Sequence, residues 1–428
     1  MVARLTASKA GKLNFNVSMP TNTNYSKTGE TTTVKGDTLT VKGALGNNGL
    51  LYNSQIKVVL DNGEGTLSEG ADGASLKVSD AKAVTLYIAA ATDYKQKYPS
   101  YRTGETAAEV NTRVAKVVQD AANKGYTAVK KAHIADHSAI YDRVKIDLGQ
   151  SGHSSDGAVA TDALLKAYQR GSATTAQKRE LETLVYKYGR YLTIGSSREN
   201  SQLPSNLQGI WSVTAGDNAH GNTPWGSDFH MNVNLQMNYW PTYSTNMAEC
   251  AQPLISYVDS LREPGRVTAK IYAGVDQGFM AHTQNNPFGW TCPGWSFDWG
   301  WSPAAVPWIL QNCWEYYEFT GDVSYMQNYI YPMMKEEAIF YDNILIDDGT
   351  GHLVSSPSYS PEHGPRTAGN TYEQTLIWQL YEDTIKAAET LGVDADLVAT
   401  WKDHQSRLKG PIEIGDSGQI KEWYEERL

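Results

Sequence analysis

The chain has 428 residues, of which 40 % are hydrophobic and 20 % charged, so it is long enough for two domains and ordinary in composition. No apolar run approaches the roughly 20 residues of a membrane-spanning helix, which excludes a membrane span from the prediction. The net charge is −10 and no Lys/Arg block occurs, so we expect no nucleic acid partner and favour an uncharged ligand. Three cysteines are too few for a disulfide framework or a thiolate zinc site.

The first part of the chain has the pattern of antiparallel strands. Between residues 14 and 91, short segments rich in Thr and Val alternate with turns that contain Gly, Asn and Asp. No polar motif typical of a functional site occurs there. The sequence therefore predicts a sheet domain with a packing or accessory role.

Helical spacing replaces this pattern between residues 103 and 148. Apolar residues recur every three to four positions, and Gly125 interrupts them, which predicts two consecutive helices. His133 and His137 stand four residues apart, but no acidic third ligand accompanies them in a zinc-protease pattern. We expect a helical connector without a metal.

Helices dominate after residue 162. Apolar stripes at helical spacing run along residues 181–192, 305–316 and 376–391, and the last two end at Gly321 and Gly392. Long loops rich in Gly, Pro, Asn and Trp separate these helices. The pattern predicts an α-helical barrel or toroid that carries its site at one rim.

Side-chain amides and aromatic residues crowd together between residues 196 and 240. Amides both donate and accept hydrogen bonds, and indole rings stack on flat apolar surfaces, so the mixture suits a neutral polyhydroxylated ligand such as a sugar. In extended structure HMNVNLQ would place the polar residues on one face, and a buried amide network is the alternative interpretation. The residues concerned are Asn206, Gln208, Trp211, Trp225, His230, Asn232, Asn234, Gln236, Tyr239 and Trp240.

A carboxyl group in a rigid loop is the candidate acid. Glu362 lies in SSPSYSPEHGPRTAG, among prolines and glycines and directly before the helix predicted over 373–391. The alternative is an ordinary exposed loop glutamate. Asp228 and Asp298 lie in aromatic loops and are secondary candidates, while the tryptophan cluster of residues 289–301 is either a ligand platform or a hydrophobic plug.

Three motifs resemble those of glycoside hydrolase family 95, the inverting α-L-fucosidases: SSRENSQLPSNLQGIW, NTPWGSDFHMNVNLQMNYWP and SPSYSPEHG. The resemblance implies an (α/α)6 barrel preceded by a β-sandwich and a helical linker, a mainly α chain with an N-terminal β region. The corresponding limits are 1–100 for the sandwich, 101–158 for the linker and 159–428 for the barrel. In the family, a catalytic aspartate and a histidine-rich segment follow the point that matches GQIKEW, so the resemblance implies a chain shortened at both ends.

The resemblance also implies roles for individual residues. Glu362 would be the general acid, and Asn232 and Asn234 would hold and polarise the attacking water through their amide oxygens. His230 would contact the sugar, and Trp299 would line the pocket. A histidine at position 230 is similar to the fucose-preferring members of the family.

The predicted function is an exo-glycosidase that removes terminal α-L-fucose, in α-1,2-type linkage, from fucosylated oligosaccharides or glycans with inversion and without a cofactor. The alternatives are a non-catalytic carbohydrate-binding remnant, a related α-L-galactosidase and, less similar in motifs, a polysaccharide lyase or a phosphorylase. The sequence leaves the oligomeric state and the compartment open. An extracellular or periplasmic location is the expectation for the parent protein, although no signal peptide is recognisable in this chain.

Overall fold

The computed structural model describes residues 1–20, 25–149, 159–211, 224–294 and 296–425, apart from the side chains of Asn62, Pro224 and Trp225. The chain forms two compact units, Met1–Ser138 and Ala139–Leu428. In the described residues, no helix combines the length and apolarity needed to cross a bilayer. The limits of the predicted sandwich, linker and barrel stay predictions.

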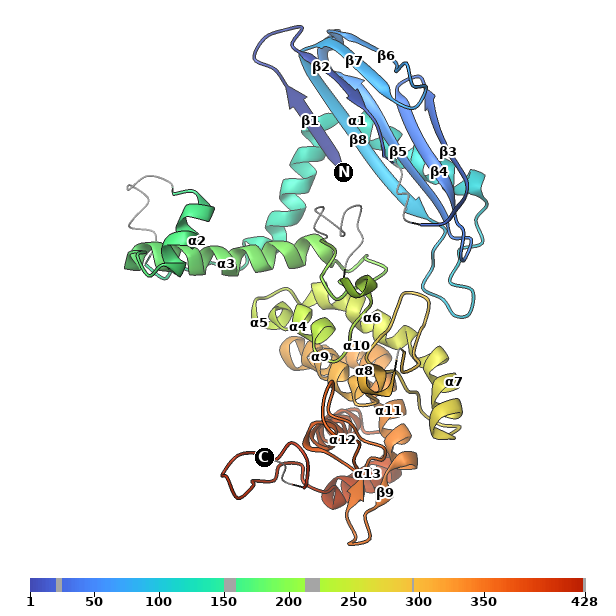
Figure 1. Ribbon diagram of the computed structural model, residues 1–428, viewed down its shortest axis with the longest axis vertical. Coiled ribbons are helices and arrows are strands. Elements are labelled where there is room, and N and C mark those ends of the chain that lie inside the picture. The colour runs from blue at the N-terminus through green and yellow to red at the C-terminus, as the bar shows by residue number, and fades with distance from the viewer. Residues whose placement is uncertain (21–24, 150–158, 212–223, 295, 426–428) are drawn as a thin grey trace. The chain divides into compact units, whose positions relative to one another are not determined.

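The first unit contains two antiparallel sheets (Figure 1). The strands of the larger sheet lie in the order β1-β8-β5-β4-β3, and those of the smaller sheet in the order β2-β7-β6. Their bounds are β1 Val2–Thr6, β2 Leu13–Val17, β3 Lys27–Lys35, β4 Thr38–Leu45, β5 Leu51–Leu60, β6 Thr66–Glu69, β7 Leu76–Ala81 and β8 Ala83–Thr92.

One hydrophobic core joins the two sheets. Leu39 and Val58 from the larger sheet and Leu76 and Val78 from the smaller sheet belong to the same buried cluster. Lys77, between the last two, is exposed, because successive side chains of a strand point to opposite faces. The predicted strands are confirmed, and the shared core has the form of a sandwich.

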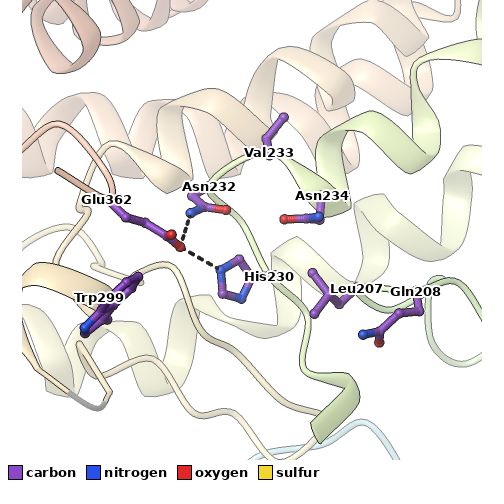
Figure 2. A pocket seen from close by; sticks show the side chains of 8 residues that line it. All are labelled: Leu207, Gln208, His230, Asn232, Val233, Asn234, Trp299 and Glu362. Carbon is purple, nitrogen blue, oxygen red and sulfur yellow. Dashed lines mark hydrogen bonds and ion pairs between the residues drawn. The ribbon is translucent and has the colours of Figure 1, made fainter. Parts of the chain in front are cut away.

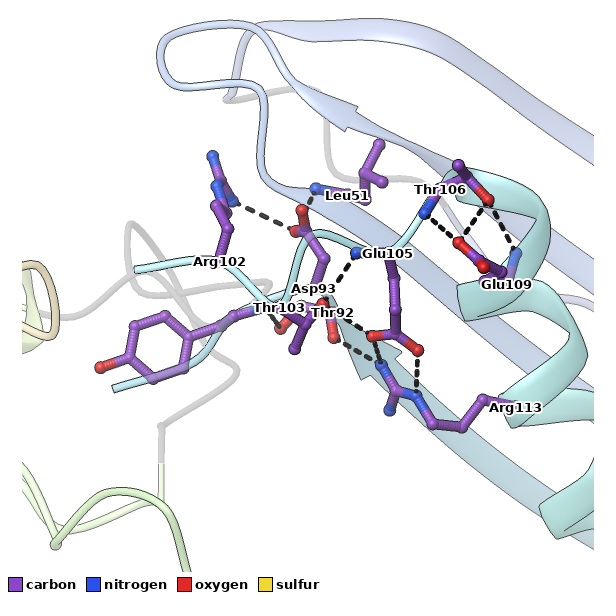
Figure 3. Close-up of polar contacts among 10 residues, drawn as sticks. Leu51, Thr92, Asp93, Arg102, Thr103, Glu105, Thr106, Glu109 and Arg113 are labelled. Carbon is purple, nitrogen blue, oxygen red and sulfur yellow. Dashed lines mark hydrogen bonds and ion pairs between the residues drawn. The ribbon is translucent and has the colours of Figure 1, made fainter. Parts of the chain in front are cut away.

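Helix α1 (Ala107–Tyr141) follows the sheets and is bent at Gly125. This glycine adopts φ 76° and ψ 157°, a conformation that residues with a Cβ rarely adopt, so the interruption that the sequence predicts is confirmed. Figure 3 shows the polar contacts that fix the chain between β8 and α1. Asp93 accepts hydrogen bonds from the Leu51 amide and from Arg102, and Arg113 donates to Glu105.

The second unit is mainly helical (Figure 1). Its helices of eight or more residues are α2 Thr161–Gln169, α3 Thr175–Ser196, α6 Gln252–Ser260, α7 Arg262–Ala273, α9 Ala305–Thr320, α11 Tyr331–Ile344, α12 Thr371–Leu391 and α13 Ala395–Arg407. The shorter elements are α4 Asn234–Tyr239, α5 Pro241–Ser244, α8 Phe297–Gly300, α10 Val323–Tyr325, β9 Ile346–Asp347 and β10 Leu353–Val354, together with helical turns at Pro224–Ser227, Ala248–Ala251 and Met326–Ile330.

Helix α12 packs against α9, α11 and α13. Its predicted apolar stripe is buried except for the half-buried Leu391, with Ile377 and Ala388 fully enclosed, and Gly392 ends the helix in the left-handed conformation. The stripe predicted on α9 is also buried, except for the half-buried Trp308. Helix α3 differs, because Val185 and Tyr188 of its predicted stripe are exposed.

Candidate active site

The segment before α4 carries the central polar residues of the site. We predicted that HMNVNLQ is extended with one polar face, and this prediction is wrong: residues 231–233 form a turn and α4 begins at Asn234. Leu, Gln and Met are good helix formers, and Leu235 and Tyr239 stand one helical turn apart and are both buried, so core packing favours a helix.

The turn divides the predicted polar strip between two places. Gln236 is fully buried and its Nε2 donates to the Met231 carbonyl at 2.7 Å, so it stabilises the turn from inside the core. His230, Asn232 and Asn234 lie on the other side and line a cavity. The polar residues therefore separate into a structural part and a ligand-facing part.

Hydrogen bonds to a neighbouring buried segment fix the backbone around His230. The Phe229 amide donates to the Asn285 carbonyl at 2.9 Å, and the Met231 amide donates to the Thr283 carbonyl at 2.8 Å. Both amides next to His230 are thus held. The imidazole, which is buried, has a defined position at the cavity.

Two carboxylates flank the His230 ring. Nδ1 lies 3.0 Å from Asp228 Oδ2, and Nε2 lies 3.6 Å from Glu362 Oε1. Burial alone would lower the pKa of His230, but the hydrogen bond and the charge of Asp228, followed by those of Glu362, outweigh it and raise the pKa. The site therefore favours the imidazolium form more than water does.

Glu362 reaches this cluster from the loop between β10 and α12. Its Oε1 accepts a hydrogen bond from Asn232 Nδ2 at 2.9 Å, and its side chain is 37 % exposed, so it is open to a ligand. Figure 2 shows the carboxylate between Asn232, His230 and Trp299, with the amide oxygens of Asn232 and Asn234 turned toward each other. The predicted acid and the predicted water-holding amides therefore line the same cavity.

Trp299 presents its indole from α8. Phe297, which begins this short helix, and Trp301, which directly follows it, stack on each other with ring centroids 5.2 Å apart. Trp299 lies between them in sequence and is 52 % exposed, so it projects away from that stack. An exposed indole at a cavity is suited to stacking against the apolar face of a sugar.

These side chains enclose a cavity of about 380 Å³. That volume lies within the roughly 300–1,000 Å³ that is usual for small-molecule sites. The lining residues are Leu207, Gln208, His230, Asn232, Val233, Asn234, Trp299 and Glu362. Together they offer one carboxylate, one imidazole, three amides and one indole to a ligand.

Comparisons with known proteins identify the family. The model of the glycosyl hydrolase family 95 catalytic domain matches residues 125–427, and that of the glycosyl hydrolase family 65 N-terminal domain matches residues 1–97. The chain belongs to glycoside hydrolase family 95. Its helical part is a glycoside hydrolase catalytic domain, as the resemblance in sequence implies.

Curated relatives are named as fucosidases. A probable alpha-fucosidase A of Aspergillus niger is 31 % identical over 88 % of this chain and 47 % of that protein. Alpha-L-fucosidase 2 of Arabidopsis thaliana is 30 % identical over the whole chain and 52 % of that protein. The chain thus spans about half the length of the curated relatives it matches.

A solved structure supports the architecture. A putative kojibiose phosphorylase from the human microbiome superposes with a TM-score of 0.64 over 99 % of this chain and 51 % of that chain, at 12 % identity. This likeness concerns the fold alone. With the family 95 match, it confirms the predicted fold class: an N-terminal β region followed along the chain by a mainly α part of the (α/α)6 toroid type.

The structure brings all five predicted site residues of this family 95 chain to one cavity. They are His230, Asn232, Asn234, Trp299 and Glu362. Asp298 does not line the cavity; it is exposed and lies 3.5 Å from Arg366. Asn206, Trp211 and Trp240 also lie outside the lining, and buried Tyr239 bonds to Ser197 instead.

Sequence reasoning missed Leu207 and Val233 as lining residues. Apolar residues carry no signal that separates a cavity wall from the core. Among the residues that the structure describes, no group of three or more His, Cys, Asp or Glu side chains is placed to hold a metal ion.

Proposed function

We propose that this site hydrolyses terminal α-L-fucosidic bonds, of the α-1,2 type, in fucosylated oligosaccharides, with inversion at the anomeric carbon. The observation that carries the proposal is the convergence of Glu362, Asn232, Asn234, His230 and Trp299 on one cavity, with the Glu362 carboxylate 2.9 Å from Asn232. The names of the relatives support fucose as the sugar.

In this proposal Glu362 is the general acid. Its carboxyl group gives a proton to the glycosidic oxygen as the bond to the anomeric carbon breaks. Asn232 donates through Nδ2 to the carboxylate and keeps its amide oxygen for other partners. That oxygen and the amide oxygen of Asn234 accept hydrogen bonds from a water molecule and aim it at the opposite face of the sugar.

His230 and Trp299 orient the sugar in the same proposal. The imidazole, buried at the cavity, offers Nε2 to a hydroxyl group, and the indole stacks on the sugar's apolar face. A sugar with a hydroxyl group next to His230 would then bind more tightly than a sugar without a polar group at that position.

One observation favours a second candidate function. Glu362 is the single carboxylate among the described residues that line the cavity, and an amide without a carboxylate partner is a weak base. Carbohydrate binding without turnover is therefore the alternative, and α-L-galactoside hydrolysis is a variant of the first proposal.

The test is to incubate the chain with an oligosaccharide that ends in α-1,2-linked L-fucose and to follow the products by proton NMR. We expect β-L-fucose to appear first, and Glu362→Gln to lower the release at least about 10²-fold while calorimetry still detects binding. The matched control is Glu389→Gln, at a surface glutamate paired with Lys402, which keeps full activity.

Three results contradict this account in different ways. Initial α-L-fucose means retention and rejects the mechanism. Binding without any release supports the non-catalytic alternative. Faster release of L-galactose than of L-fucose from matched substrates rejects the choice of sugar.

A further inference from the structure

Asp228 stands behind the imidazole of His230, on the side opposite Glu362. Its Oδ2 lies 3.0 Å and its Oδ1 3.3 Å from Nδ1, so both carboxylate oxygens face one ring nitrogen. The Asp228 side chain is 14 % exposed and does not line the cavity. The contact that links it to the cavity is the one with His230.

The backbone of Asp228 is anchored as firmly as that of His230. Its carbonyl accepts a hydrogen bond from the Leu207 amide at 2.9 Å, and the next amide, of Phe229, bonds to Asn285. Leu207 is itself a lining residue of the cavity. These backbone hydrogen bonds fix the position from which the Asp228 carboxylate contacts the His230 ring.

A carboxylate accepts hydrogen bonds and donates none, so the proton of this contact resides on Nδ1. The second nitrogen, Nε2, then faces Glu362 Oε1 at 3.6 Å. Catalytic hydrogen bonds are often long in the free enzyme and shorten in the substrate complex. Asp228 and Glu362 are the two acidic groups that act on this ring.

We propose that Asp228 is a positioning residue that fixes the ring and tautomer of His230, so that Nε2 returns a proton to Glu362 after each proton transfer to a leaving group. The proposal rests on the proposed function. In the transfer, the Nε2–H bond of the imidazolium breaks and an O–H bond forms on the Glu362 carboxylate. Neutral imidazole and a carboxylic acid result, and the imidazole regains its proton from solvent.

This role differs from that expected for a sugar-binding histidine alone. A histidine that only contacts a hydroxyl group needs no carboxylate behind it, and a ring in that role can donate from either nitrogen. Here the pair of Asp228 oxygens on Nδ1 leaves Nε2 as the nitrogen that faces the acid. The order Asp228, His230, Glu362 is that of a proton relay.

The first test reads the tautomer without any need for turnover. The full chain is labelled with ¹⁵N-histidine, and the His230 signals are assigned by their loss in His230→Gln. We expect a protonated Nδ1 throughout the titration, and in Asp228→Asn a lower pKa for His230, because a negative charge beside the ring is gone. A wild-type ring that carries its proton on Nε2 alone, or identical titrations in both proteins, would overturn the proposal.

The second test uses turnover of the fucosylated oligosaccharide. We expect Asp228→Asn to lower kcat by at least about 10-fold, because a carboxylate that orients a catalytic histidine is lost, with KM unchanged. The alkaline limb of the pH profile should also move to lower pH, which a merely structural role would not produce. Equal loss at every pH, or a change in KM alone, would refute the relay.

The matched control is Asp298→Asn, the same chemical change at an exposed aspartate next to Trp299. It should leave both the His230 signals and the pH profile unchanged. If the wild-type chain releases no fucose, the proposed function fails, whereas the NMR titration still decides whether Asp228 sets the tautomer of His230.

Discussion

Glu362 lies in a loop that is fixed by hydrogen bonds on both sides of it. Ser358, four residues earlier, is buried and donates to Glu373 Oε2 at 2.5 Å, while Ser360 donates to Glu422 Oε1 at 2.6 Å. His363 Nε2 lies 3.1 Å from the same Glu422 oxygen. These contacts limit the movement of the acid's carboxyl group.

Glu373 makes this anchor sensitive to pH. Burial raises its pKa from 4.5 to about 7, against the hydrogen bond from Ser358, which lowers it. Between these two pH values the folded state holds a proton that the unfolded state has released. The free energy of unfolding should therefore fall as the pH rises from 4.5 to about 7 and then level off, by at most about 1.4 kcal/mol per pH unit.

Glu373→Gln tests this dependence, since the amide cannot titrate. Urea unfolding is measured for both proteins at about pH 5 and about pH 8. We expect the wild type to lose stability relative to the variant at the higher pH. Asp383, whose pKa burial also raises, is present in both proteins and cancels in the difference. A difference that is the same at both pH values contradicts the account.

Some residues of the site can be predicted from the sequence, and others cannot. Residue type and a rigid loop make Glu362 a candidate, and residue type does the same for the amides beside His230, but their roles come from the resemblance to family 95. Leu207 and Val233 give no such signal. The contact of Asp228 with His230 depends on the turn that the backbone takes between them, which spacing of two residues does not specify.

At the level of elements, α1 begins with a reciprocal cap. The Glu109 amide donates to Thr106 Oγ1 at 3.3 Å, and the Thr106 amide donates to Glu109 Oε2 at 2.7 Å (Figure 3). Both amides would otherwise lack an intrahelical partner. The cap lies close to the end of β8, where Asp93 accepts a hydrogen bond from the Leu51 amide and Arg113 of α1 donates to the Thr92 carbonyl.

Thr106→Ala should lower the free energy of unfolding of the first unit by about 1 kcal/mol, within roughly 0.5–2, because one capping oxygen is lost. Chemical denaturation followed by circular dichroism measures the change. Thr112→Ala is the control, since Thr112 is exposed within the same helix and bonds only to the Ala108 carbonyl among the described contacts. Equal effects of the two substitutions would mean that the cap does not stabilise α1.

Periodicity predicted most of the elements and failed where two patterns overlap. HMNVNLQMNY satisfies both a strand alternation and a short helix, and the burial of Leu235 and Tyr239 in the tertiary core decides for the helix. On α12 the pattern agrees with packing, so Ile377 and Leu380 are buried as predicted. An apolar stripe such as that of α3 predicts a helix, but it does not predict which other element packs against that face of the helix.

At the scale of the whole molecule, the sequence already indicates a β-rich first part and a helical second part. All twelve tryptophans lie at or after Trp211, and the residues before them include the strands of the first unit. The family matches divide the chain earlier, with the sheet domain in residues 1–97 and the catalytic domain in 125–427, so all the tryptophans lie within the catalytic domain. Closure of helices around a site depends on contacts far apart in sequence, which local patterns do not contain.

The central claim is that one cavity holds the sugar between Glu362, the two asparagines, His230 and Trp299. A crystal structure of Glu362→Gln with an oligosaccharide that ends in α-L-fucose tests it most directly. We expect the fucose ring on Trp299, its glycosidic oxygen about 3 Å from the substituted side chain at position 362, and a water molecule between Asn232 and Asn234. A fucose bound elsewhere on the chain, with this cavity free of sugar, would contradict the claim.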